Sequence, residues 1–171
     1  MAPRLAAMRR RNIVACTLVA FATFGAGSAQ AARPFHLSRA EQTLLVAINS
    51  ARAAAGVPPL RATPALTSAA TWQSQVLAQA GILDHTSPDG STLIDRLTRV
   101  RWHGTAAGED LAVAGSASEA VAMWMQSPGH RAAILSDTYK EMGAGVVAAS
   151  AFKSLTGSPA GTFIQNFGRC A

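Results

Sequence analysis

Two histidines and one glutamate are the residues of this chain best suited to chemistry. His85 stands in a turn-forming stretch, residues 84–90; Glu109 follows a glycine, and His130 follows the sequence Ser-Pro-Gly. Imidazole nitrogens and carboxylate oxygens bind zinc, and catalytic zinc sites leave one position open for water. The same groups serve as general acids and bases. We therefore predict that His85, Glu109 and His130 meet in one polar site, as metal ligands or as catalytic groups.

Each of these residues also has a simpler interpretation. Long gaps separate them, and no local spacing such as HExxH supports a metal site. Loop histidines such as His85 are commonly surface residues, and glutamates such as Glu109 are commonly solvated. His130 would be the third residue of a helix, where the helix dipole disfavours imidazolium, so a neutral ring is expected near pH 7. His36 and His103 have no such neighbours and are predicted to lie on the surface.

Other polar and aromatic residues near these histidines are expected to have structural roles. Glu119 follows Ser116 by the spacing of a capping box, which places it outside the polar site. Ser127 precedes a proline and is predicted to cap a helix, so it is not expected to act as a nucleophile. Trp124 and Met125 lie at helical spacing and are predicted to belong to the core.

Composition favours one folded domain and argues against a nucleic-acid partner. The chain has 171 residues, of which 49% are hydrophobic, and a formal net charge of +6. A chain of this length buries one sizeable core. Four arginines lie within the first eleven residues, and the rest of the chain carries only about +2,. We therefore expect no nucleic-acid partner.

The N-terminus has the layout of a signal peptide. Residues 1–11 are basic, and residues 13–25 are apolar but shorter than the roughly 20 residues of a membrane span,. We expect cleavage near Ala31/Ala32, secretion to the medium or the cell envelope, and no transmembrane segment afterwards. The alternatives are twin-arginine export, a lipoprotein box ending at Cys16, and an uncleaved anchor.

Cleavage would leave Cys170 as the single cysteine of the mature chain. No intramolecular disulfide would then form, and packing alone would have to stabilise the fold. We expect a monomer.

Periodicity and capping residues predict helices early in the mature chain and strands late in it. Helices are expected over residues 38–55, 64–80, 91–100, 116–126 and 127–135, and strands over 106–114, 143–149 and 162–167,. Ser38 with Glu41, Thr63 before Pro64, and Ser91 are the expected N-terminal caps of the first three helices. The last two strands are expected to form an antiparallel hairpin, and this order of elements favours an α+β fold.

Several motifs follow one another in a characteristic order between residues 41 and 168. They are Ile48-Asn49-Ser50-Ala51-Arg52, Trp72, His85-Thr86-Ser87-Pro88-Asp89-Gly90, Asp95-Arg96-Leu97, Gly108-Glu109-Asp110-Leu111-Ala112, residues 124–135, Met142-Gly143-Ala144-Gly145-Val146 and Gln165-Asn166-Phe167-Gly168. Through these motifs and their order the chain resembles the CAP superfamily. This superfamily comprises cysteine-rich secretory, antigen 5 and pathogenesis-related 1 proteins with an SCP domain. The resemblance is strongest to the secreted bacterial branch.

The resemblance implies a three-layer α-β-α sandwich with a small central antiparallel sheet. It also implies a cleft lined by two histidines and acidic residues that in some members binds zinc or another divalent cation. The motifs place the histidines at His85 and His130 and the first acid at Glu109. The implied cleft or structural neighbours are Asn49, Arg52, Ser127 and Asn166.

Three positions depart from the family pattern. Asp110 stands where the family often has asparagine, and Ser127 stands where animal and plant members have a second acid. Ala133 replaces an asparagine that is common in the bacterial branch. The missing second acid removes one ligand carboxylate from the expected metal site.

The expected organisation is a signal peptide (1–31), a lead-in (32–40), a CAP domain (41–168) and a short tail (169–171). The resemblance implies a binding module for a lipid, a cell-surface component or a protein partner. The alternative is a zinc-dependent extracellular hydrolase of peptide or cell-wall substrates, with His85 and His130 holding zinc and Glu109 as ligand or general base. A third interpretation is a structural domain with a residual polar cleft.

Overall fold

The computed structural model describes residues 35–148 and 161–170. Its elements in chain order are α1 (Arg39–Ala54), β1 (Arg61–Ala62), α2 (Pro64–Ala80), α3 (Leu93–Arg99), β2 (Gly104–Ala114), α4 (Ala117–Gln126), α5 (Pro128–Ile134), β3 (Glu141–Ala148) and β4 (Gly161–Cys170). The expected signal peptide, its cleavage site and the connection between the last two strands lie outside the described residues.

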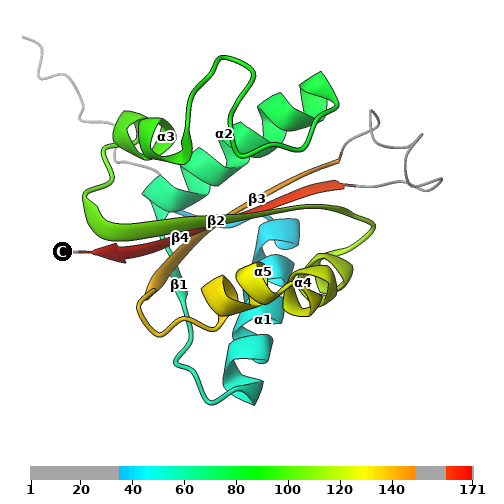
Figure 1. Cartoon of the computed structure of the whole chain (residues 1–171), viewed down its shortest axis with the longest axis vertical. Coiled ribbons are helices and arrows are strands. Elements are labelled where there is room, and N and C mark those ends of the chain that lie inside the picture. The colour runs from blue at the N-terminus through cyan, green and yellow to red at the C-terminus, as the bar shows by residue number, and fades with distance from the viewer. Residues whose placement is uncertain (1–34, 149–160, 171) are drawn as a thin grey trace, which may run out of the picture. The chain divides into compact units, whose positions relative to one another are not determined.

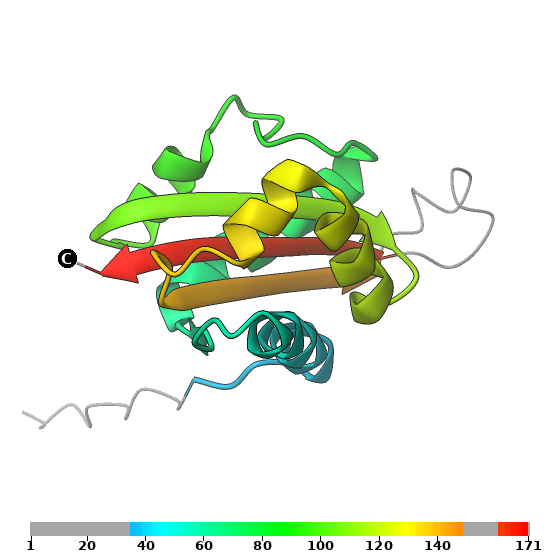
Figure 2. The same ribbon diagram turned by 60° about the horizontal axis from the view of Figure 1, so that its bottom comes forward.

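One four-stranded sheet forms the middle layer. Its strand order is β1-β3-β4-β2; β4 runs antiparallel to both β3 and β2, and β1 runs parallel to β3. Helices α2 and α3 pack on one face of the sheet, and α1, α4 and α5 pack on the other (Figure 1; Figure 2). This arrangement confirms the predicted α+β sandwich and the antiparallel pairing of the last two strands. It places β2 at an edge of the sheet.

The ends of the first two helices follow from local chemistry. Ser38 and Glu41 form the predicted capping box at the start of α1,. Pro64 occupies the first turn of α2, and Gly81 ends that helix in the left-handed conformation, with φ +68°,. The side chain of Thr63 makes no capping hydrogen bond, although its backbone holds the cap position.

The cap of α3 differs from the prediction by one residue. Thr92, and not Ser91, exchanges hydrogen bonds with Asp95 as a capping box. The Ser91 hydroxyl donates instead to Asp89, at 2.6 Å. Asp95 decides between the two hydroxyl residues, because only Thr92 lies three positions before a carboxylate.

Two glycines of β3 allow α2 to lie directly on the sheet. A Cβ atom on Gly143 would overlap the backbone of Leu66 and Thr67, and one on Gly145 would overlap the backbone carbonyl of Ala70. The Ser74 hydroxyl donates to the carbonyl oxygen of Gly145 at 2.9 Å. The contact between helix and strand is therefore made by backbone, with no room for a side chain.

Trp124 lies in the core between the sheet and the α1/α4/α5 layer. It is buried, and its indole N–H donates to the carbonyl oxygen of Leu111 at 2.9 Å. Leu44, Ile48 and Met142 belong to the same buried cluster. The prediction that Trp124 is a core residue is confirmed.

None of the helices in the described part of the chain has the length and apolarity that a bilayer crossing requires.

Candidate functional site

Two acidic side chains stand next to each other on the edge strand β2. Successive residues of a strand point to opposite faces of its sheet. Glu109 contacts Arg96 of α3, whereas Asp110 lies near His130 of α5. The strand therefore presents one carboxylate to each helical layer.

Glu109 forms a buried ion pair that also holds His85. Its two carboxylate oxygens accept from Nη2 of Arg96 at 2.8 and 2.7 Å, and both side chains are almost fully buried, at 2% and 1% exposure. Its Oε1 lies 3.0 Å from Nδ1 of His85, whose ring is largely exposed. The structure thus brings His85 and Glu109 together, as the sequence predicts.

Arg96 also organises the loop that carries His85. Its Nη1 donates to the carbonyl oxygens of His85 and Ser91, both at 3.1 Å, and to the Ser87 hydroxyl oxygen at 3.0 Å. The Ser87 hydroxyl in turn donates to Oε1 of Gln73 in α2, at 2.6 Å. The position of His85 therefore depends on one buried guanidinium, a role that the sequence motif alone did not show.

His130 and Asp110 form a second pair on the other side of β2. Nε2 of His130 lies 4.0 Å from Oδ1 of Asp110, and Oδ2 of Asp110 has no hydrogen-bond partner among the described residues. Burial, together with the negative charge of Glu109, raises the pKa of Asp110 to about 7,. Burial and the nearby charge of His85 lower the pKa of His130. The predicted neutral ring at His130 agrees with this direction, but the cause is burial and His85.

The three predicted ligands do not form a zinc ligand set as they are placed. Among the side chains that the structure describes, no group of three His, Cys, Asp or Glu lies close enough to hold a metal ion. Both oxygens of Glu109 accept from Arg96, whose positive charge opposes a second cation there,. Zinc binding by His85, Glu109 and His130 stays a prediction, which a zinc titration of the chain and of its His85→Ala/His130→Ala variant tests.

Two of the predicted neighbours have structural roles. Arg52 is fully buried and donates to the carbonyl oxygens of Pro58 and Ser136, at 2.8 and 2.9 Å. Asn49 exchanges two hydrogen bonds with the backbone of Leu60, at 2.9 and 2.8 Å. Both side chains thus fix the chain that leaves α1.

The remaining predicted neighbours lie at the ends of α4 and α5 and on β4. Ser127 occupies the N-cap of α5, but its side chain makes no capping hydrogen bond, contrary to the prediction. Glu119 stays out of the site, because its carboxylate accepts from the backbone N–H of Gly115 at 2.9 Å. The backbone of Asn166 pairs with that of Glu109 across β4 and β2.

The burial of Asp110 predicts that its contribution to stability falls as pH rises. Because its pKa is about 7 in the folded chain and near 4 when unfolded, the folded state holds the proton more tightly,. Between pH 4 and pH 7 the contribution of Asp110 to the free energy of unfolding should fall by about 1.4 kcal/mol for each pH unit. The Asp110→Asn variant lacks this titration. The difference between its free energy of unfolding and that of the parent should therefore shift in favour of the variant by about 2–3 kcal/mol from pH 5 to pH 8. Urea unfolding at both pH values measures this change; parallel pH profiles would contradict it.

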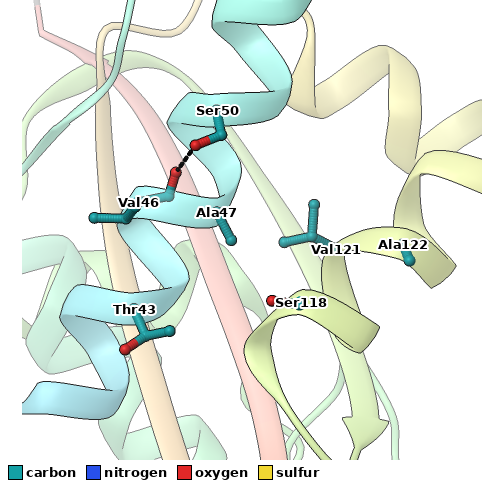
Figure 3. A pocket seen from close by; sticks show the side chains of 7 residues that line it. All are labelled: Thr43, Val46, Ala47, Ser50, Ser118, Val121 and Ala122. Atoms are coloured by element: carbon teal, nitrogen blue, oxygen red, sulfur yellow. Dashed lines mark hydrogen bonds between the residues drawn. The ribbon is translucent and has the colours of Figure 1, made fainter.

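A groove of about 460 Å³ lies apart from these pairs, between α1 and α4. Thr43, Val46, Ala47 and Ser50 line it from α1, and Ser118, Val121 and Ala122 line it from α4 (Figure 3). The hydroxyls of Thr43 and Ser50 donate to carbonyl oxygens one turn earlier in α1, at 2.8 and 2.9 Å. These two residues therefore add mainly carbon to the wall of the groove.

Comparison with known proteins gives consistent relatives. The family model described as "CAP: Cysteine-rich secretory protein family" matches residues 45–167. The Bacillus subtilis protein YkwD is 30% identical over 115 residues, which are 67% of this chain and 45% of YkwD. The chain thus spans less than half of that relative.

Solved structures share the fold. An extracellular protein from Bacillus anthracis that contains an SCP domain is 26% identical, with a TM-score of 0.66 over 75% of this chain and 40% of that one. An outer surface protein from Borrelia burgdorferi is 19% identical, with a TM-score of 0.66 over 76% of this chain and 92% of that one. With its motifs, its three-layer fold and the family match in agreement, the chain belongs to the CAP family of cysteine-rich secretory proteins.

Proposed function

We propose that this chain is a secreted binding module that takes the acyl chain of a lipid in the groove between α1 and α4. The apolar wall of that groove is the observation that carries the proposal. Val46 is 55% exposed, and Ala47 and Val121 point toward each other from the two helices (Figure 3). Apolar surface that is removed from water stabilises a complex by roughly 25 cal/mol per Å².

The chemistry of the lining favours an acyl chain over a polar ligand. Among the described residues, no charged side chain lines the groove, and two of its hydroxyls bond within α1. A carboxylate or phosphate headgroup would find no cation among these lining residues, so it would stay at the solvent edge. The methylene chain would account for the binding energy.

An extracellular location agrees with two observations. The matching Bacillus anthracis protein is described as extracellular, and the Borrelia protein as an outer surface protein. The N-terminal segment of this chain has the layout of a signal peptide,. We place the function outside the cytoplasm, with cleavage near Ala31/Ala32.

Filling the groove with a tryptophan tests the proposal. Ser50 is exposed and lines the groove, so Ser50→Trp should occupy the space without disturbing the core. The affinity for a fluorescent fatty acid that palmitate displaces should fall at least tenfold, or about 1.4 kcal/mol. Gln79→Trp places the same side chain on an exposed position of α2 and should leave the affinity unchanged. Absence of saturable binding, or equal affinity in both variants, would refute the acyl-chain site.

The second candidate is an extracellular hydrolase of peptide or cell-wall substrates, centred on the edge of β2. It is favoured by two partly or largely exposed histidines, His85 and His130, beside two buried carboxylates. A neutral His130 with a lowered pKa can accept a proton from an attacking water, and Asp110 lies 4.0 Å from its Nε2,. Hydrolysis of a peptide or peptidoglycan substrate that is lost in His130→Ala would favour this activity over binding alone.

A further inference from the structure

We propose that the surface around Trp72 binds a neutral oligosaccharide. This surface consists of α2, the start of α1 and α3, so it is separate from the α1/α4 groove. The proposal goes beyond acyl-chain binding and does not depend on it. It rests on two adjoining hollows, the side chains that line them and the pairing of nearby charges.

The two hollows share one aromatic side chain. The larger, about 450 Å³, is lined by Phe35, Ser68, Trp72 and Gln75, among others. The smaller, about 270 Å³, lies between α2 and α3, and Ser68 and Trp72 also line it. The guanidinium of Arg99 lies 5.1 Å from the centre of the Trp72 ring, in a cation–π contact with the indole,. One indole thus borders both hollows. A ligand made of several linked sugar rings can occupy the two hollows at once.

The lining of the larger hollow combines aromatic rings with groups that donate and accept hydrogen bonds. Phe35 and Trp72 supply apolar faces, on which the C–H faces of a sugar ring can pack,. The side chains of Ser68 and Gln75 are exposed, and neither makes a hydrogen bond to another described residue. A hydroxyl and an amide offer both donors and acceptors. This mixture matches a sugar better than an acyl chain.

Each hollow is also lined by a residue with a buried polar atom that lacks a hydrogen-bond partner among the described residues. These atoms are Oγ1 of Thr67, which lines the larger hollow, and Nε of Arg96, which lines the smaller one. A buried donor without a partner costs free energy. A ligand oxygen would remove that cost where the side chain turns its polar atom toward the hollow.

The charges around the hollows favour a neutral ligand. The carboxylate of Glu41 accepts from the Ser38 backbone N–H at 2.8 Å and from the Thr71 hydroxyl at 3.0 Å, so it is fixed in place as a negative charge. Arg99 pairs with Asp89 at 3.2 Å, and Arg96 pairs with Glu109. An anionic sugar would meet Glu41 and find both of these arginines already paired with acids.

Calorimetric titration with cellotetraose and chitotetraose tests the proposal, because these neutral oligosaccharides differ in their hydroxyl and acetamido groups. At least one should bind saturably. Gln75→Ala should weaken its binding at least fivefold, and Trp72→Ala at least tenfold. Gln79→Ala, one helical turn further along α2 and also exposed, should leave the affinity unchanged.

Three outcomes would overturn the proposal. Neither oligosaccharide binds at millimolar concentration, only a sulfated oligosaccharide binds, or Gln75→Ala and Gln79→Ala bind equally well. Thermal unfolding of Gln75→Ala shows whether any loss reflects misfolding. Ser50→Trp should retain oligosaccharide binding, which separates a failure of this proposal from a failure of the acyl-chain site.

Discussion

Replacing Arg96 with methionine is expected to destabilise the chain by about 3–5 kcal/mol, because it leaves Glu109 as a buried charge without its cation. The variant would also lose the three hydrogen bonds that Nη1 donates to oxygen atoms of His85, Ser87 and Ser91. Methionine has a similar length, so the change tests the charge and the hydrogen bonds more than the packing. Urea unfolding at pH 7 measures the difference.

Arg99→Met is the matched control in the same helix. Arg99 pairs with Asp89 at 3.2 Å, and both side chains are about half exposed. Exposed ion pairs contribute about 0–1 kcal/mol, and the exposed contact of Arg99 with the Trp72 ring about 0.5–1 kcal/mol, so this variant should lose much less stability than Arg96→Met,. Adding Glu109→Gln to Arg96→Met should restore part of the lost stability. Equal losses in the two arginine variants would show that Arg96 does not hold the site together.

Replacing Gly143 with alanine is expected to cost more than about 4 kcal/mol or to prevent folding. The new Cβ would overlap the backbone of Leu66 and Thr67 in α2. Backbone atoms of a packed helix cannot move aside as the end of a flexible side chain can, so α2 would have to leave the sheet. Circular dichroism and urea unfolding measure the effect.

Gly129→Ala serves as the control for this substitution. A Cβ at Gly129 would meet no atom within 4 Å, and the residue lies in helix α5. Alanine is favoured over glycine in a helix by up to about 1 kcal/mol, so this variant should be as stable as the parent or slightly more stable. A Gly143→Ala variant with the same stability as Gly129→Ala would show that α2 does not lie on the backbone of β3.

Local capping chemistry made much of the fold predictable. Ser38 with Glu41 and Gly81 mark helix ends through interactions between residues that are close in the sequence. The pairing of the last two strands was also predictable, because a stretch rich in Gly, Ser and Pro, typical of a turn, joins two strand-like segments,. The two-residue strand β1 was not predicted, since its pairing with β3 depends on residues 80 positions away, as at Arg61 and Glu141.

The candidate site was predictable only in part. Sequence motifs and the family resemblance selected His85, Glu109 and His130, and the structure brings the first two into contact. The role of Arg96 was not predicted, because arginines are mostly exposed and its partner is 13 residues away,. The sequence signal for this role was the position of Arg96 on the inward face of a short helix. The burial of Asp110 could not be predicted from the sequence either, because the exposure of a carboxylate to water depends on tertiary packing.

Placing His85 and His130 in different helical layers has a consequence for the order of folding. The loop of His85 is held by α2 and α3, whereas His130 belongs to α5 on the opposite face of the sheet. A folding intermediate with only one layer docked would hold both acids on β2 but only one of the two histidines beside them. The two histidines and the two acids are assembled only when both helical layers have docked on β2. Any activity that needs both histidines therefore begins with the last docking step. Such an activity reports that the chain has reached its native state.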